Sequence, residues 1–298
     1  GKGAGMMSKT LRGDRLFHFI IILFCACIFI VVAYPLYFVV IASVSDPTAV
    51  STGQVIFWPK GTSLKGYGLV FSYDKLWIGY RNTIFYTIVG TLFNLAVTLP
   101  AAYAASRKEF MPRRVIMFLF AFTMYFGGGL IPTFLLIKEV GLYNTPWVFI
   151  IPFSLNVYNF IITRSFFESG LSESMHEAAV LDGCNDFRYF ISVVLPLSRA
   201  IIAVVMLYYA VGHWNDYYTG LVFIRNEQLV PLQLVLREIL LIADSSNLIG
   251  SSGYSNALSY VEAMRYGVIL VSTLPLLIIY PFVQKYFEKG VMLGAVKG

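Results

Sequence analysis

The chain has 298 residues; 58% of them are hydrophobic, only 13% are charged, and the net charge is +6. Soluble domains are about 45–50% apolar and about 25% charged, so this composition argues against a soluble protein and indicates a surface that largely faces lipid. The three cysteines are too few for a disulfide scaffold and form no C-x-x-C pair.

Six long, almost uncharged runs follow one another along the chain. A helix needs about 20 mainly apolar residues to cross a bilayer, and lipid requires that such a segment satisfy its own backbone hydrogen bonds. Five runs lack Asp, Glu, Lys and Arg, and one is interrupted only by Asp216: residues 16–45, 82–106, 115–137, 140–163, 200–224 and 266–284. They predict an all-α integral membrane protein with six transmembrane helices.

The first run, residues 16–45, follows basic residues in the way that the core of a signal peptide does. Such a core is about 7–15 residues long, and this run is nearly twice the upper limit, so it predicts a membrane anchor. In the third run, Gly127–Gly129 and Pro132 predict a break or a kink. That irregularity would serve either gating or tight helix packing.

The segment 168–196, between the fourth and fifth runs, is not apolar. Ser174–Glu177 fits an S-x-x-E capping box that begins a helix, and Gly183 is placed to end it. Asp186 is then placed to cap a second short helix, which Pro196 limits. The two helices would lie along the membrane face, either as an ordinary connector or as a surface that another protein approaches closely.

The basic residues are distributed unevenly between the two sides of the membrane. The side that holds both termini and the loops 106–114 and 164–199 has 14 of the 22 Lys and Arg residues, and the other side has 8. By the positive-inside rule both termini are cytoplasmic. The excess of basic residues is therefore explained by the orientation of the chain in the membrane, and nucleic acid is not expected as a partner.

The spacing of Glu177–Ala179, of Gly183 four residues later and of Leu195–Pro196 twelve residues after the glycine resembles the EAA motif. That motif marks the inner-membrane permease subunits of binding-protein-dependent ABC importers. Val193 stands where the family usually has isoleucine. The resemblance implies a type I ABC importer permease fold in which the segment 168–196 is a cytoplasmic coupling-helix loop.

Further segments narrow the resemblance to the carbohydrate-uptake branch, which includes the maltose-type permeases. Lys289–Gly298 looks like the family's tail, Arg81–Thr83 opens the second run as the family's core usually opens, and Tyr125–Thr145 resembles the subgroup for complex oligosaccharides. The implied organisation is a cytoplasmic N-terminus (1–15), a first helix (16–45), an extracellular segment (46–80), a five-helix permease core (81–285) and a cytoplasmic tail (286–298).

The resemblance also implies the partners. No G-x-x-x-x-G-K-[ST] phosphate-binding loop occurs in the chain, so the chain would bind no cofactor itself, and ATP and Mg would be bound by two cytoplasmic ATP-binding subunits. A second, similar but non-identical permease subunit and an extracytoplasmic solute-binding protein would complete the importer in the lipid bilayer. Contacts with the ATP-binding subunits are implied for Glu177, Ala178, Ala179, Asp182, Gly183, Leu195, Pro196, Lys297 and Gly298.

Two segments leave alternatives open. Lys297 and Gly298 either reach the ATP-binding subunits or form an unordered chain end. Asp244–Tyr254 is polar and contains glycine, so it is expected to be an extracellular loop. This loop either probes the binding protein or is a solvated linker.

Polar and aromatic residues in the spans are candidates for the substrate path, because polar groups are costly in lipid. Asn156 and Asn159 are three residues apart, hence on one helix face, and they bond either sugar hydroxyls or a neighbouring helix. The cluster around Asp216 either contacts sugar or anchors the chain at the outer interface. The candidates are Tyr125, Asn156, Asn159, Trp214, Asn215, Asp216 and Tyr217.

Two other classes of protein compete with a permease. An ion-coupled secondary sugar carrier would carry buried ionisable residues near the middle of the membrane, and the runs offer only Asp216. A membrane-bound enzyme would need a cluster of histidine or carboxylate residues, and the scattered His18, His176 and His213 form none.

Overall fold

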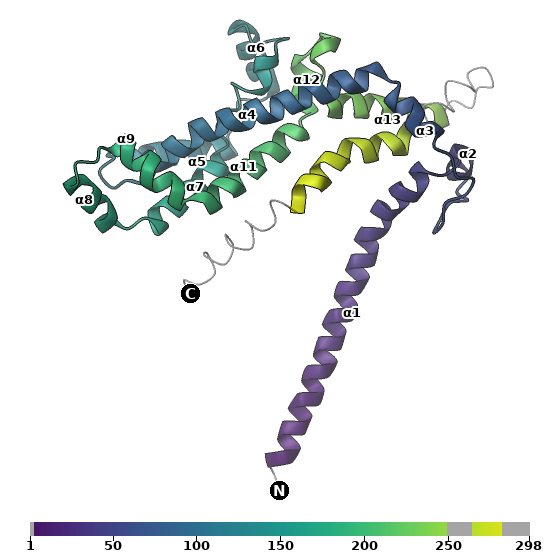
Figure 1. The fold of residues 1–298 in the computed structure, drawn as a ribbon, viewed down its shortest axis with the longest axis horizontal. Coiled ribbons are helices and arrows are strands. Elements are labelled where there is room, and N and C mark those ends of the chain that lie inside the picture. Colours follow the sequence, from purple (N-terminus) through teal and green to yellow (C-terminus); the bar gives the residue numbers. More distant parts are fainter. Residues whose placement is uncertain (1–2, 249–263, 282–298) are drawn as a thin grey trace. The chain divides into compact units, whose positions relative to one another are not determined.

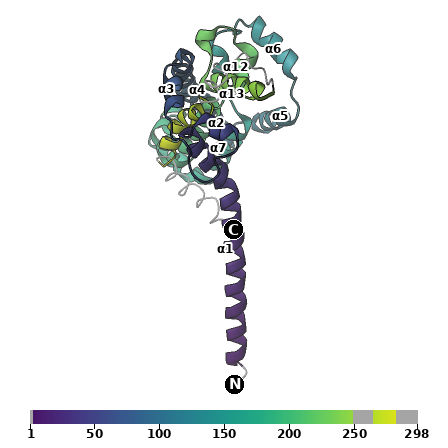
Figure 2. The same cartoon turned by 90° about the vertical axis from the view of Figure 1, so that its right-hand side faces the viewer.

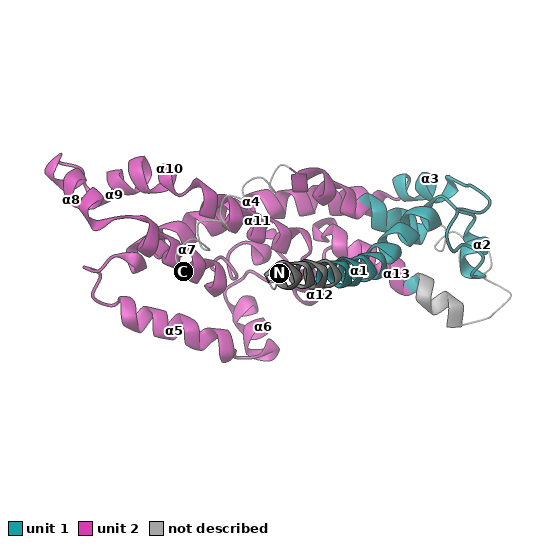
Figure 3. Cartoon of the chain, turned by 90° about the horizontal axis from the view of Figure 1, so that it is seen from below, with its two compact units in different colours: residues 1–72, 242–271 teal, residues 73–241, 272–298 magenta. Residues whose placement is uncertain are grey.

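The computed structural model describes residues 3–248 and 264–281, and this part of the chain is helical with connecting turns. It divides into two compact units, which Figure 3 colours separately. Unit 1 comprises Gly1–Ser72 and Ile242–Val271, and unit 2 comprises Tyr73–Leu241 and Ser272–Gly298.

Unit 1 contains the long helix α1 (Gly3–Ser43) and the short helices α2 (Pro47–Ser51) and α3 (Lys65–Phe71). From Phe17 to Val40, α1 is mainly apolar and mostly exposed, as the predicted anchor requires, and Ile41–Ser43 are buried. The turn after α1 is fixed by Asp46, whose carboxylate accepts from the Thr48 backbone N–H at 2.9 Å. This bond caps the first turn of α2.

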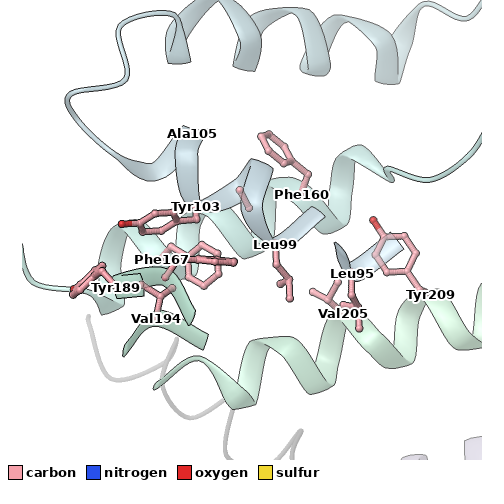
Figure 4. Close-up of a cluster of buried hydrophobic side chains, with 12 residues drawn as sticks. Leu95, Leu99, Tyr103, Ala105, Phe160, Phe167, Tyr189, Val194, Val205 and Tyr209 are labelled. Atoms are coloured by element: carbon pink, nitrogen blue, oxygen red, sulfur yellow. The ribbon is translucent and has the colours of Figure 1, made fainter. Parts of the chain in front are cut away.

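Unit 2 is built on α4 (Asp74–Ser106), which packs along α7 (Val157–Gly170) and α11 (Arg199–Trp214), as Figure 1 shows. Figure 4 shows the core that these helices share: Leu95, Leu99 and Tyr103 of α4 meet Phe160 and Phe167 of α7 and Val205 of α11. Tyr189 and Val194 extend this cluster towards the segment 168–196.

The described residues contain three single helices that are long and apolar enough to cross a membrane: Phe17–Ser43, Asp74–Ser106 and Met264–Pro281. Two bent helix pairs raise the number to five if each pair is one span. The predicted runs 140–163 and 200–224 are wrong as single continuous helices, because turns precede α7 in the first run and the second is interrupted between Trp214 and Tyr218.

The predicted irregularity at Gly127–Gly129 is confirmed. Helix α5 (Arg113–Tyr125) ends before the glycines and α6 (Leu130–Glu139) begins after them, with a bend of 116° that is visible in Figure 2. Gly129 has φ = +84°, in the region that glycine adopts without a steric penalty.

The run 140–163 is mostly turns and the 3₁₀ helix η1 (Pro146–Phe149) before α7 begins. Asn144, with φ = +56°, holds these turns: its side-chain oxygen accepts from the backbone N–H groups of Arg225 at 2.9 Å and Asn226 at 2.8 Å. The Asn144 backbone N–H donates to the Phe223 carbonyl at 2.9 Å, so a backbone group that a continuous helix would satisfy internally is bonded here to another segment of unit 2.

The beginning of α4 is joined to the segment that contains η3 (Glu227–Leu229) and leads into α13 (Leu232–Leu248). The Asn82 amide donates to the carbonyls of Gln228 at 2.8 Å and Val230 at 3.0 Å. The Thr83 hydroxyl oxygen accepts from the Leu232 N–H at 2.9 Å. Asn82 and Thr83, which belong to the segment that resembles the start of the family's core, thus fix the segment that contains η3 on α4.

The loop predicted for Asp244–Tyr254 is wrong for Asp244–Leu248, which form the end of α13. The rest of that loop lies outside the described residues, as does the tail with Lys297 and Gly298.

Candidate docking and transport sites

The segment 168–196 contains the short helix α8 (Glu173–Leu181), at one end of unit 2 in Figure 3. The predicted capping box is wrong: Ser172 holds the extended N-cap conformation, and Ser174 lies inside the helix with its hydroxyl donating to Ser172 Oγ at 3.2 Å. The S-x-x-E pattern fits Ser174, but the helix begins two residues earlier, and Ser172 makes no capping hydrogen bond with its side chain.

The predicted end of α8 at Gly183 is confirmed. Gly183 has φ = +75°, its N–H bonds the Val180 carbonyl at 2.9 Å, and the Cys184 N–H bonds the Ala179 carbonyl at 2.9 Å. This pair of bonds is a Schellman motif, which places glycine at the left-handed position.

The second helical stretch differs from the prediction at both ends. Asn185, not Asp186, caps α9 (Asp186–Tyr189), because its side-chain oxygen accepts from the Arg188 N–H at 2.8 Å. The chain continues through a π-helical turn, Phe190–Val194, and α10 (Leu195–Leu197), and then bends by 83° into α11. Pro196 does not end the stretch; it lies at the start of α10, where a missing N–H costs little.

Helix α8 and the turn after it present an exposed surface. No residue of α8 is buried, and Leu181 is 89% exposed and Phe187 72% exposed. These two large apolar side chains are exposed in a loop that is otherwise largely polar, so the loop is a candidate surface for another protein. Sequence reasoning missed both residues, although Leu181 precedes Asp182 and Phe187 lies between Asp186 and Arg188.

The predicted docking residues lie on or beside this surface. Ala179 is half-buried against the core, and Leu195 packs on the same cluster. The others that the structure describes are exposed: Glu177, Ala178, Asp182, Gly183 and Pro196.

An ion pair joins α8 to the loop after α4: Lys108 Nζ lies 2.6 Å from Glu173 Oε2. The shared hydrogen bond raises the pKa of Lys108 and lowers that of Glu173. The pair is therefore fully charged at neutral pH and is lost as the pH falls through the depressed pKa of Glu173. Because both groups are exposed, the pair contributes little to stability.

A cavity of about 330 Å³ lies among α4, α7 and α11 and is lined by polar and aromatic side chains. His213 Nε2 lies 3.0 Å from Asn94 Oδ1, and the Asn94 amide nitrogen donates to the Phe153 carbonyl at 3.2 Å. The lining residues are Asn94, Phe149, Phe153, Asn156, Asn159, Tyr208, Tyr209, Gly212, His213, Asp216, Tyr218 and Thr219.

Three of the predicted path residues line this cavity. Asn156 caps α7 by accepting from the Asn159 N–H at 3.1 Å, and Asp216 accepts from the Thr219 N–H at 3.0 Å. Asn159 is only 5% exposed and is one of the residues that line the cavity.

The other predicted path residues lie elsewhere. Trp214 is buried and its indole N–H donates to the Ser272 carbonyl at 3.2 Å. Asn215 donates to the Val211 carbonyl in its own helix, Tyr217 lies under the Arg237 guanidinium, and Tyr125 is exposed. Asn94 and His213, which sequence reasoning missed, were detectable as polar residues inside uncharged runs.

The family of the chain follows from comparison with known proteins. A sequence model of the family described as "Binding-protein-dependent transport system inner membrane component" matches residues 75–293. The chain belongs to this family. It is therefore a multi-pass inner-membrane permease subunit of a binding-protein-dependent importer, and the predicted family and class are confirmed.

Individual relatives match along almost the whole chain. The polygalacturonan/rhamnogalacturonan transport system permease protein YtcP of Bacillus subtilis is 36% identical over 285 residues, which cover 96% of this chain and 99% of the relative. Protein LplC of the same organism is 35% identical, with 98% of each chain covered.

A solved structure has the same fold as this chain. It is the crystal structure of a bacterial ABC transporter involved in the import of the acidic polysaccharide alginate. One of its chains matches with a TM-score of 0.84 and 35% identity, covering 93% of this chain and 98% of that one. The type I ABC permease fold is confirmed.

Substitutions at Gly183 should separate backbone strain from bulk. A Cβ there would meet no atom within 4 Å, so the cost of Gly183→Ala is mainly that of the positive φ, about 1 kcal/mol. Gly183→Asn relieves part of that strain because asparagine tolerates this conformation. We expect the apparent Tm in detergent to fall less for Asn than for Ala; equal falls would show that strain is not the cause.

Proposed function

We propose that this permease subunit conducts an oligosaccharide across the cytoplasmic membrane in an ATP-driven importer that works by alternating access. The relatives named for polygalacturonan/rhamnogalacturonan and the neighbour involved in alginate import support a carbohydrate substrate. The observation that carries the proposal is the cavity among α4, α7 and α11 with its polar and aromatic lining, to which Asn159 contributes.

The cavity suits a sugar because it combines hydrogen-bonding groups with aromatic rings. The amides of Asn156 and Asn159 and the second carboxylate oxygen of Asp216 are able to bond hydroxyls. Tyr208 and Tyr218 offer apolar ring faces for the C–H side of a sugar ring. A substrate hydroxyl in the cavity would give the Asn159 amide a hydrogen-bond partner.

Helix α8 with Leu181 and Phe187 is, on this proposal, the surface that docks a cytoplasmic ATP-binding subunit. Two such subunits would bind ATP and Mg, a second and non-identical permease would complete the path, and a binding protein would deliver the sugar from outside. The 14-to-8 distribution of basic residues supports placing α8 and both termini in the cytoplasm.

The docking role is tested by Leu181→Asp. A carboxylate at this exposed apolar position would have to be desolvated on binding, so we expect the ATP-binding subunit to be lost when the assembly is purified through a tag on this chain. Ser174→Ala, an exposed change on the same helix, should retain the subunit. Retention in both variants would contradict docking through this surface.

The sugar role is tested by Asn159→Leu, which keeps the volume of the side chain and removes its amide. We expect stimulation of the ATPase activity of the whole assembly by oligosaccharides to fall by about tenfold, because a buried hydrogen bond to substrate is lost. The panel should contain neutral and acidic oligosaccharides. Asn215→Ala, an asparagine outside the cavity, is the control; equal losses in the two variants would exclude a specific role for Asn159.

A further inference from the structure

Helix α8 has few attachments to the rest of unit 2. None of its nine residues is buried, and only His176 and Ala179 are half-buried. These two residues are three apart and so lie on the same face of the helix. Ala179 offers a single methyl group to the core, which leaves His176 as the larger inward side chain.

The His176 ring is bonded on both sides. Its Nδ1 lies 2.7 Å from Arg107 Nη2, and its Nε2 lies 3.0 Å from Asp186 Oδ1. A guanidinium group only donates, so Nδ1 accepts and Nε2 carries the proton that is donated to the carboxylate. A single tautomer of the neutral ring satisfies both contacts.

The His176 side chain is also enclosed, with only 16% of it exposed. The ring stands edge-on to Tyr189 at a centroid distance of 5.0 Å. Tyr189 is itself buried in the core cluster of unit 2. The ring therefore has a fixed position as well as two directional hydrogen bonds.

The three bonded residues belong to three different elements. Arg107 follows the last residue of α4, His176 lies in the middle of α8, and Asp186 begins α9. Along the chain, α8 is connected only to α7 on one side and to α9 on the other. The His176 contact adds a direct connection from α8 to the end of α4.

We propose that His176 is a positioning residue that couples movement of the docking helix α8 to the membrane helix α4. This inference rests on the proposed docking of an ATP-binding subunit at α8. When that subunit moves α8, the Arg107–His176–Asp186 bridge transmits the displacement to α4 as well as to α7 and α11. The exposed Lys108–Glu173 pair joins the same two elements and acts beside the bridge.

The test measures ATP hydrolysed per sugar molecule imported, with the complete assembly in proteoliposomes. His176→Phe keeps the ring against Tyr189 and removes both hydrogen bonds. His176→Gln removes the ring and keeps one acceptor and one donor. We expect the ratio to rise at least threefold in His176→Phe, with the ATP-binding subunit still bound, and to rise less in His176→Gln.

A larger rise in His176→Gln than in His176→Phe would show that the packing of the ring, and not the hydrogen-bonded bridge, is responsible for coupling. A wild-type ratio in His176→Phe would overturn the proposal. Arg107→Met should raise the ratio similarly, and the double variant should be no worse than either single one, because the residues act as a unit. Additive effects would also contradict the bridge. Ser174→Ala on the same helix is the control.

Failure of this inference is distinguishable from failure of the proposed docking. If Leu181→Asp releases the ATP-binding subunit but His176→Phe behaves as wild type, docking stands and the bridge is refuted. If Leu181→Asp retains the subunit, the docking surface itself is wrong.

Discussion

Gly90→Val should destabilise the protein by about 2–5 kcal/mol and abolish uptake. Any Cβ at Gly90 would lie 2.5 Å from His213 Nε2, so the imidazole ring has to move and its 3.0 Å contact with Asn94 is lost. The estimate combines a lost buried hydrogen bond with the strain of overpacking between α4 and α11. The measurements are the apparent Tm in detergent and sugar uptake in proteoliposomes.

Gly212→Ala is the matched control for this change. Gly212 also lines the cavity and lies in α11, next to His213, but a Cβ there meets nothing within 4 Å. Because alanine favours a helix more than glycine by about 1 kcal/mol, the control should keep or raise the apparent Tm. A wild-type Tm in Gly90→Val would mean that α4 and α11 are not packed as closely as the structure has them.

Asn82→Ala is expected to have the next largest effect, about 2–4 kcal/mol. The amide is 6% exposed and donates to two carbonyl groups, those of Gln228 and Val230. Truncation leaves both acceptors without this donor, and an unsatisfied buried group costs about 1–3 kcal/mol. The predicted result is a lower apparent Tm together with faster proteolysis in the segment that contains η3.

Arg81→Ala provides the comparison, because Arg81 donates to the same Gln228 carbonyl at 3.3 Å but is exposed. Its loss should cost less than about 1 kcal/mol. If the two substitutions lowered the Tm equally, the burial of Asn82 would not explain its effect.

Gly79→Ala should weaken the same junction between α4 and the start of α13, since its Cβ would lie 2.9 Å from the Leu232 Cα.

The end of α8 was predictable because its cause is local. Gly183 ends the helix through its own backbone conformation and two bonds within six residues of it. The start was not predictable from the S-x-x-E pattern, because that pattern fits Ser174 and not Ser172, whose third following residue is Met175. Only the backbone geometry distinguishes the N-cap from the residue two places later.

The uncharged runs predicted a membrane protein but not the continuity of its helices. The absence of charge in residues 140–163 indicates that they are buried in lipid or protein. It does not indicate which groups their backbone N–H and C=O groups bond. There the Asn144 side chain bonds backbone N–H groups 81 and 82 residues away, which no local pattern reveals. Gly127–Gly129 indicated a break in the third run, and Gly141, Pro146 and Pro152 are signals of the same kind in the run 140–163.

The candidate sugar cavity likewise contains residues that the sequence pattern could predict and residues that it could not. Asn156 and Asn159 were found from their spacing within one run, because that spacing survives as cap and first turn of α7. Asn94 and His213 are 119 residues apart and meet only because α4 packs on α11. Helix packing of this kind depends on the whole core, not on any motif.

The length of α4 has a mechanical consequence. Its 33 residues span about 50 Å at 1.5 Å per residue, while the hydrocarbon core of a bilayer is about 30 Å thick. Near its N-terminus, α4 carries Asn82, which bonds the segment around η3. The residue that follows its C-terminus is Arg107, which bonds His176 of α8. Helix α4 is thus long enough to join the two aqueous faces. On the proposed function, the occupancy of one face and the position of α8 at the other would be thermodynamically linked, each biasing the other to the same degree.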